Sequence, residues 1–241
     1  MNKYLQGESN YDKWPVIKVK DTKHECLAGW AVISQHLLEQ LNKIQKEQKI
    51  IVFECYQGVS DKEIVFELQK HVTGTWFFSK DYMLSKNEID SLVYPDVTDD
   101  EVFGYMTRLT LKDFFDANKL QNAKRVIEEK EGTQIVYGCG ASILYPEADL
   151  LIYIDMARWE IQQRFRKNEV SNLGVCNKEL KPSLQYKRAF FVDWRVCDRL
   201  KKQIMNHWDF VLDTNAQGYP KMVSGEDLRT AYRQAVANHF V

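Results

Sequence analysis

Two short apolar segments decide the fold of this chain: Gln-Ile-Val-Tyr-Gly-Cys at residues 134–139 and Leu-Leu-Ile-Tyr-Ile at residues 150–154. Both are too short for helices and are rich in Ile, Val and Tyr, which indicates strands buried in a parallel sheet. The second segment ends at Asp155 and runs directly into a predicted helix that is rich in arginine. In an open α/β sheet, ligands bind outside the carboxyl ends of the strands. We therefore expect an anion site where this segment ends.

On both sides of these segments, further short strands alternate with helical patterns. Strands are predicted at residues 49–54, 75–79 and 208–213, and a strand or extended segment at 187–192. Helices are predicted at 29–48, after Ser60 or Asp61, after Ser85, Thr98 and Thr110, at 111–127, at 194–206 and at 228–238. Alternation of this kind predicts βαβ units with right-handed crossovers. The predicted fold class is α/β, with a parallel sheet between two layers of helices.

The chain divides into two parts. Residues 1–48 contain a polar arm with scattered aromatics and then an amphipathic helix, and we expect both to pack on the core. Residues 49–241 form the α/β domain itself. Within it, residues 168–185 lack any periodicity and contain Asn, Gly, Lys, Pro and Ser. That composition predicts a loop, which could act as a mobile lid.

Composition excludes several classes of function. Of the 241 residues, 44% are hydrophobic, which is enough for a sizeable core, and Lys plus Arg (33) almost cancel Asp plus Glu (34). No overall field attracts nucleic acid or an anionic membrane, so any anion site is local. The five cysteines are scattered and odd in number, which argues against disulfides and a zinc site. No signal peptide or membrane span is recognisable, and we expect a cytoplasmic protein.

The turn after the first predicted strand, residues 55–62, stands where a P-loop protein cradles phosphates on backbone amides. Lys62 matches the phosphate-binding lysine, but Asp61 replaces the glycine before it and Glu63 replaces the Mg²⁺-binding hydroxyl. Two carboxylates would repel a triphosphate, so the sequence favours an ordinary strand-to-helix turn over a working ATP site. A nucleotide and Mg²⁺ are expected as cofactors only if kinase activity is retained.

The middle of the chain resembles the uridine kinase branch of P-loop kinases. The resemblance rests on the altered phosphate loop and on segments 78–82 (Phe-Ser-Lys-Asp-Tyr), 135–138, 151–155, 164–166 and 208–213. It implies a P-loop kinase-like fold over roughly residues 49–213. It also implies that Asp81, with Lys62, is the catalytic residue if catalysis survives, because Asp81 matches the aspartate that takes the proton from the sugar hydroxyl. The alternative is that Asp81 caps a turn.

A second resemblance, to an amino-terminal domain of bacterial class I mannose-6-phosphate isomerases, spans nearly the whole chain. Its motifs are Glu54-Cys55-Tyr56 with Gly58-Val59, Thr98-Asp99-Asp100 with Val102-Phe103-Gly104, residues 157–162 (Ala-Arg-Trp-Glu-Ile-Gln), 186–191, 193–195, 212–215 and 220–222. In that family a metal-binding cupin domain follows and carries out the isomerisation. The resemblance implies a role in carbohydrate metabolism and a cupin isomerase partner, in cis or in trans. The chain ends about where the cupin would begin, so we expect a truncated or free-standing relative.

No metal site is predicted, because the five histidines (His24, His36, His71, His207 and His239) are dispersed. The candidate ligand-binding residues are instead basic or acidic side chains near the strand ends. They are Glu54, Tyr56, Gly58, Asp155, Arg158, Arg164, Arg166, Lys187, Arg188, Asp193 and Arg195. Arginine forks suit phosphate or carboxylate. The competing interpretation is that the arginines pair with Glu160 and Glu169, and that the aspartates cap helices.

Three hypotheses follow. The first is a degenerate P-loop kinase-like domain that binds a phosphorylated sugar or nucleotide and regulates a mannose-6-phosphate isomerase module. The second is an active small-molecule kinase that uses Lys62, Asp81 and the arginines. The third is a structural domain whose basic edge docks the cupin isomerase.

Overall fold

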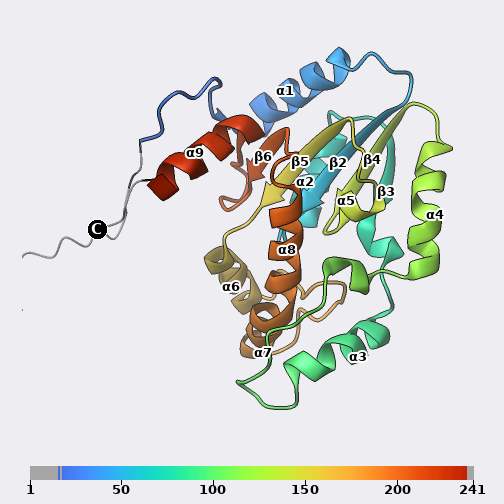
Figure 1. Ribbon diagram of the computed structural model, residues 1–241, viewed down its shortest axis with the longest axis vertical. Helices are drawn as coiled ribbons and strands as arrows, with labels where there is room; N and C mark the ends of the chain where they lie inside the picture. Colours follow the sequence, from blue (N-terminus) through green and yellow to red (C-terminus); the bar gives the residue numbers. More distant parts are fainter. Residues whose placement is uncertain (1–15, 17, 238–241) are drawn as a thin grey trace, which may run out of the picture.

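A computed structural model describes residues 16 and 18–237, and its centre is a twisted sheet (Figure 1). The strands of this described part are β1 (Leu27–Ala28), β2 (Lys49–Cys55), β3 (Thr75–Phe78), β4 (Thr133–Gly138), β5 (Leu150–Asp155), β6 (Phe210–Asp213) and β7 (Lys221–Ser224). Their order across the sheet is β1-β7-β6-β5-β2-β4-β3. Strands β2 to β6 are parallel, whereas β7 and β1 are antiparallel to their neighbours.

Helices cover the sheet and extend beyond the carboxyl ends of its parallel strands, where α3, α6 and α7 lie (Figure 1). The helical elements are α1 (Trp30–Lys43), α2 (Asp61–Gln69), η2 (Ser79–Tyr82), α3 (Lys86–Val97), η3 (Leu111–Phe114), α4 (Ala117–Glu128), α5 (Ala141–Leu144), α6 (Arg158–Arg166), α7 (Pro182–Arg188), the π-helical turn η4 (Ala189–Asp193), α8 (Trp194–Ile204) and α9 (Gly225–Ala237). Among the residues described, no helix combines the length and apolar character needed to span a bilayer.

Strand β2 is the centre of the parallel set. It lies between β4 and β5, with Ile51 opposite Ile135 on one side and Leu150 on the other. Its side chains from Ile50 to Cys55 are buried, as expected for a strand covered on both faces. The strand before the loop at residues 55–62 is therefore central to the parallel set. The predicted α/β class with a parallel core is confirmed.

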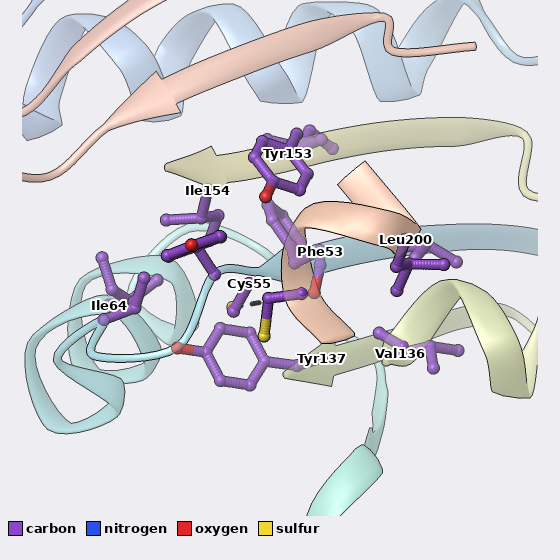
Figure 2. Packing of buried hydrophobic residues seen from close by; sticks show 14 of the residues in the cluster. Phe53, Cys55, Ile64, Val136, Tyr137, Tyr153, Ile154 and Leu200 are labelled. Atoms are coloured by element: carbon purple, nitrogen blue, oxygen red, sulfur yellow. Dashed lines mark hydrogen bonds between the residues drawn. The ribbon is translucent and has the colours of Figure 1, made fainter. Parts of the chain in front are cut away.

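The core packs helix α8 against the carboxyl halves of the central strands. Figure 2 shows Leu200 of α8, Val136 of β4 and Phe53 of β2 among the side chains of one buried hydrophobic cluster. Phe53 is 1% exposed and Val136 is fully buried. Burying side chains of this size contributes about 1.5–3 kcal/mol each. This packing fixes the strand ends from which the candidate site is built.

Three predictions about local structure were wrong. Residues 187–192, predicted as a strand or extended segment, belong to α7 and η4, because buried ion pairs and packing override the β-like run of Phe and Val. Thr98 does not begin a helix: it ends α3 with φ of 59° and donates to the carbonyl of Phe103. The sheet is mixed rather than purely parallel, because β7 and β1 add antiparallel pairs. The sequence did not reveal these two strands, since they are too short to show a clear pattern.

The predicted loop at residues 168–185 ends early, because α7 already begins at Pro182. Its first part has no helix or strand, yet Val170, Asn172 and Leu173 are buried. Asn172 donates to the carbonyl of Gln185 at 2.9 Å. The segment is thus tied to the helix that follows it, and its action as a lid stays a prediction.

The predicted arm is described only from residue 18 onward and at residue 16, so residues 1–15 and 17 lie outside the described part. The backbone N–H groups of Lys23 and His24 donate to the carboxylate of Asp227 in α9 at 2.8 and 3.1 Å. Ser224 donates its hydroxyl to the same carboxylate at 2.8 Å. These contacts fasten the segment before β1 to the last helix.

Acid is expected to loosen this attachment. Burial opposes ionisation of Asp227, but the hydrogen bonds from Lys23, Ser224 and His24 outweigh it and lower its pKa to about 2. A folded-state pKa below the unfolded value means that the stabilisation is fully present above about pH 4 and is lost as the pH falls toward 2. Chemical denaturation between pH 5 and 2 should therefore show a smaller loss of stability for Asp227→Asn than for the wild type. An identical pH dependence in both proteins would contradict this assignment.

Candidate functional site

A cleft of about 730 Å³, here called cleft 1, opens at the carboxyl ends of β2, β3 and β4. Its walls come from the loop after β2 (residues 55–62), from Phe78 to Lys80, from Tyr137 to Cys139, and from residues 169–178. Its volume lies in the range of small-molecule sites, about 300–1,000 Å³. The sheet topology thus places a cavity of ligand size where an open α/β sheet usually binds its ligand.

Three lysines line cleft 1: Lys62 at the start of α2, Lys80 in η2 and Lys178 in the covering segment. Within residues 16 and 18–237, no carboxylate lies within 4 Å of any of these three ammonium groups. The charged residues opposing them in the lining are Asp61 and Glu169. The cleft therefore carries a net positive charge and can attract an anion.

Asp61 directly precedes Lys62 and belongs to the wall of cleft 1. Its carboxylate accepts a hydrogen bond from the Tyr137 hydroxyl at 2.9 Å. Figure 2 shows the Tyr137 ring extending from β4 toward α2, the helix that carries Ile64. Asp61 stays accessible to solvent, but the concave protein surface around it replaces much of its water and raises its pKa. The carboxylate is thus a hydrogen-bond acceptor that suits a ligand hydroxyl better than a phosphate.

The loop after β2 is packed on protein side chains. Gly58 has φ of 93°, and a Cβ placed there would lie 2.7 Å from Ile161 Cγ1. The Arg164 guanidinium donates to the carbonyls of Gly58 and Thr214, both at 3.1 Å. Gln57 accepts from the Trp194 indole at 3.0 Å. Side chains of α6 and α8 therefore hold this loop in place.

Glu54 is 1% exposed and lines neither cleft 1 nor the second cleft described in the next paragraph. Its carboxylate accepts from the backbone N–H groups of Gly140 and Ser142, at 2.6 and 2.8 Å, and from the Ser142 hydroxyl at 2.8 Å. Burial raises its pKa to about 7, and these hydrogen bonds partly oppose that shift. In this geometry Glu54 holds the turn between β4 and α5.

A second cleft of about 570 Å³, cleft 2, lies at the carboxyl ends of β5 and β6. Arg158 pairs there with Asp198, which also accepts from the Tyr56 hydroxyl at 2.8 Å. Lys201 pairs with Asp155 at 2.6 Å. Tyr56 lines both clefts. Of the predicted ligand-binding residues, Tyr56, Arg158 and Asp155 thus come together in cleft 2, where their charges are mutually paired.

The other predicted basic residues do not converge on one cleft. Lys187 is buried and donates to the carbonyl of Asp100. Arg188 is buried too and pairs with Asp193 at 3.3 Å. Arg195 donates to the carbonyl of Phe190 at 3.0 Å, and Arg166 lies exposed beside Gln163. Asp81 is exposed and is absent from the lining of either cleft.

Among the residues that line cleft 1, sequence reasoning missed Phe78, Lys80, Tyr137 and Lys178, which the proposal below uses. Phe78 and Lys80 follow the rule that ligands bind at strand ends, and this rule could have identified them. Lys80 also lies over the Phe78 ring, with its ammonium 5.3 Å from the ring centroid. No sequence signal marks Lys178, which reaches the cleft only through the fold of the covering segment.

The fold and the cleft define a class of protein: an α/β domain with a cavity of ligand size at the carboxyl ends of its parallel strands. The chain belongs to the family described as a domain of unknown function, DUF8485, whose model matches residues 29–237. No curated protein matches the sequence. Among solved structures, the chain is similar to a protein from Silicibacter sp. TM1040 described as a candidate fructose transport system kinase, with 13% identity and a TM-score of 0.46, over 70% of this chain and 94% of that one.

Proposed function

We propose that this domain binds a phosphorylated sugar or a nucleotide in cleft 1 without transferring its phosphate. The observation that carries the proposal is the lining of the cleft, where Lys62, Lys80 and Lys178 surround a space of ligand size. Lysine is a point-charge ligand for phosphate. The aromatic rings of Phe78 and Tyr137 offer apolar surface to a sugar or base.

The position of Asp61 distinguishes this site from a triphosphate site. A carboxylate directly before Lys62 places negative charge where a phosphate loop offers backbone N–H groups. The carboxylate is held by Tyr137 and faces the same cleft as the lysines. A ligand with one phosphate and several hydroxyls satisfies both charges, with its phosphate on the lysines and a hydroxyl on Asp61.

Thermal-shift measurements test the proposal. A hexose 6-phosphate or a nucleoside monophosphate that binds only the folded chain should raise its melting temperature. By titration calorimetry, Lys80→Ala and Lys178→Ala should each weaken binding of that ligand about 10- to 150-fold, since a hydrogen bond to a charged group contributes about 1.5–3 kcal/mol. Lys202→Ala, an exposed lysine outside the cleft lining, is the matched control and should leave binding unchanged.

Two results would overturn the proposal. One is the absence of any shift with hexose phosphates, nucleotides and inorganic phosphate at millimolar concentration. The other is tight binding of ATP and Mg²⁺ with phosphate transfer to a sugar or nucleoside, which would instead identify an active kinase that depends on Lys62 and Asp81.

Regulation of, or docking to, a mannose-6-phosphate isomerase stays a prediction from motif resemblance. The motifs at Glu54-Cys55-Tyr56 and at residues 157–162 support it, and they are the reason to place hexose 6-phosphates first among the ligands tested.

A further inference from the structure

Two thiols lie in contact between the sheet and helix α8. Cys139 directly follows β4 and Cys197 lies in α8, and their Sγ atoms are 3.5 Å apart although the residues are 58 positions apart in the sequence. Cys197 is 4% exposed, whereas Cys139 lines cleft 1 and is only half-buried. A reagent that enters cleft 1 therefore meets Cys139 first.

We propose that Cys139 and Cys197 form a reversible disulfide, with a low-molecular-weight disulfide that enters through cleft 1 as the oxidant. The Cys139 thiolate attacks one sulfur of the oxidant, releases one small thiol and becomes a mixed disulfide. The Cys197 thiolate then attacks the Cys139 sulfur and releases the second small thiol. The protein loses two protons and two electrons, and the oxidant gains both as it is reduced to two thiols.

The required movement is small. A disulfide needs a sulfur separation of about 2.05 Å, so the two Sγ atoms must approach by about 1.5 Å. The other cysteines offer no such pair: Cys26 and Cys176 are exposed free thiols, and Cys55 is buried, with its thiol donating a hydrogen bond to the carbonyl of Phe53. Contact and unequal access together assign the roles of attacking thiol to Cys139 and resolving thiol to Cys197.

The surroundings set the pace of this chemistry. The hydrogen bond with Cys197, burial, and the nearby Glu54 and Cys55 on β2 raise the pKa of the Cys139 thiol well above its usual value. None of these neighbours is a cation that would favour the thiolate of Cys139, so its oxidation by a disulfide is slow at neutral pH. The pair is therefore suited to a lasting change of state rather than to rapid turnover.

The disulfide would join the turn after β4 to α8, the helix that contacts the altered loop. Trp194, at the start of α8, donates to Gln57, and Asp198, next to Cys197, accepts from Tyr56. Gln57 and Tyr56 both line cleft 1. Any effect on ligand affinity rests on the proposed function, but formation of the disulfide does not.

The test uses the full chain, incubated for several hours at alkaline pH with oxidised glutathione. Free thiols are then alkylated, and the protein is digested without reduction for peptide mass mapping. The expected product is a cross-link between the peptides of Cys139 and Cys197, about 2 Da lighter than the two reduced peptides together and reversed by dithiothreitol. Oxidised protein should also melt at a higher temperature than reduced protein, because the link restricts the unfolded chain.

Matched variants separate this link from other thiol chemistry. Cys176→Ser removes another thiol that lines cleft 1 and should leave the cross-link intact, whereas Cys139→Ser and Cys197→Ser should each abolish it and remove the gain in melting temperature. Circular dichroism establishes that each variant is folded. Stable glutathione adducts without a cross-link, or a cross-link through Cys55, would overturn the proposal. None of these readouts requires a ligand, so failure of the proposed function is detected separately.

Discussion

Asp193→Ala is expected to lower the free energy of unfolding by about 3–5 kcal/mol, because it breaks the buried ion pair with Arg188 and leaves that guanidinium with an exposed carboxylate partner, Asp90. Asp193 is fully buried at the junction of η4 and α8. Its carboxylate accepts from Arg188 at 3.3 Å, from the Asn172 amide at 2.6 Å and from the backbone N–H of Leu173 at 3.3 Å. One side chain therefore ties the segment that covers cleft 1 to the helix beneath it.

Urea denaturation measures this effect. Glu101→Ala provides the matched control, since it removes a carboxylate from an ion pair with Lys181 in which both side chains are largely exposed and the charges are 4.0 Å apart. That change should cost less than about 0.5 kcal/mol. A loss below about 1 kcal/mol for Asp193→Ala would show that Arg188 is satisfied by Asp90, its other carboxylate partner at 3.2 Å.

Gly58→Ala should destabilise the protein by about 2–5 kcal/mol, the sum of left-handed backbone strain of about 1–2 kcal/mol and overpacking of about 1–3 kcal/mol. The strain arises from φ of 93°, and the overpacking from Ile161, whose Cγ1 and Cγ2 atoms would lie 2.7 and 2.9 Å from the new Cβ. Neither atom can withdraw easily, because Ile161 is fully buried. We expect the loop at residues 55–62 to change position in this variant, because Gly58 belongs to it.

Gly132→Ala separates the two contributions, since Gly132 has φ of 77° and a methyl group added there would meet no other atom of the described chain within 4 Å. It should show the backbone strain by itself. In an Ile161→Ala background, Gly58→Ala should cost no more than Gly132→Ala does in the wild type. Equal costs for Gly58→Ala in both backgrounds, read from a double-mutant cycle of unfolding free energies, would remove Ile161 from the explanation.

The strands that form the parallel core were predictable because burial on both faces leaves a continuous apolar run. Segments 49–54 and 150–154 became β2 and β5 almost without change in their bounds. Local side-chain chemistry was equally clear at Ser85, which begins α3 with the predicted cap. Where an element is short or its burial is decided by a distant partner, as for residues 187–192, the local pattern indicated the wrong structure.

The candidate site was predictable only in part. The altered loop with Lys62 lies at cleft 1, whereas Asp155, where the anion site was expected, lines cleft 2. The roles of the arginines could not be predicted in the same way, because the sequence does not distinguish an arginine that faces a ligand from one that pairs with a buried group. Arg164 and Arg188 proved to be buried, with backbone carbonyls and carboxylates as their partners.

The amino-acid sequence by itself determined the α/β class, the central strands and the carboxylate directly before Lys62, because each depends on residues that are neighbours along the chain. Tertiary structure decided which charges are free. Lys80 and Lys178 meet Lys62 across cleft 1, and Cys139 meets Cys197, only after crossovers bring separate strand ends and helices together. Contacts between distant residues depend on packing and register, which local periodicity does not encode.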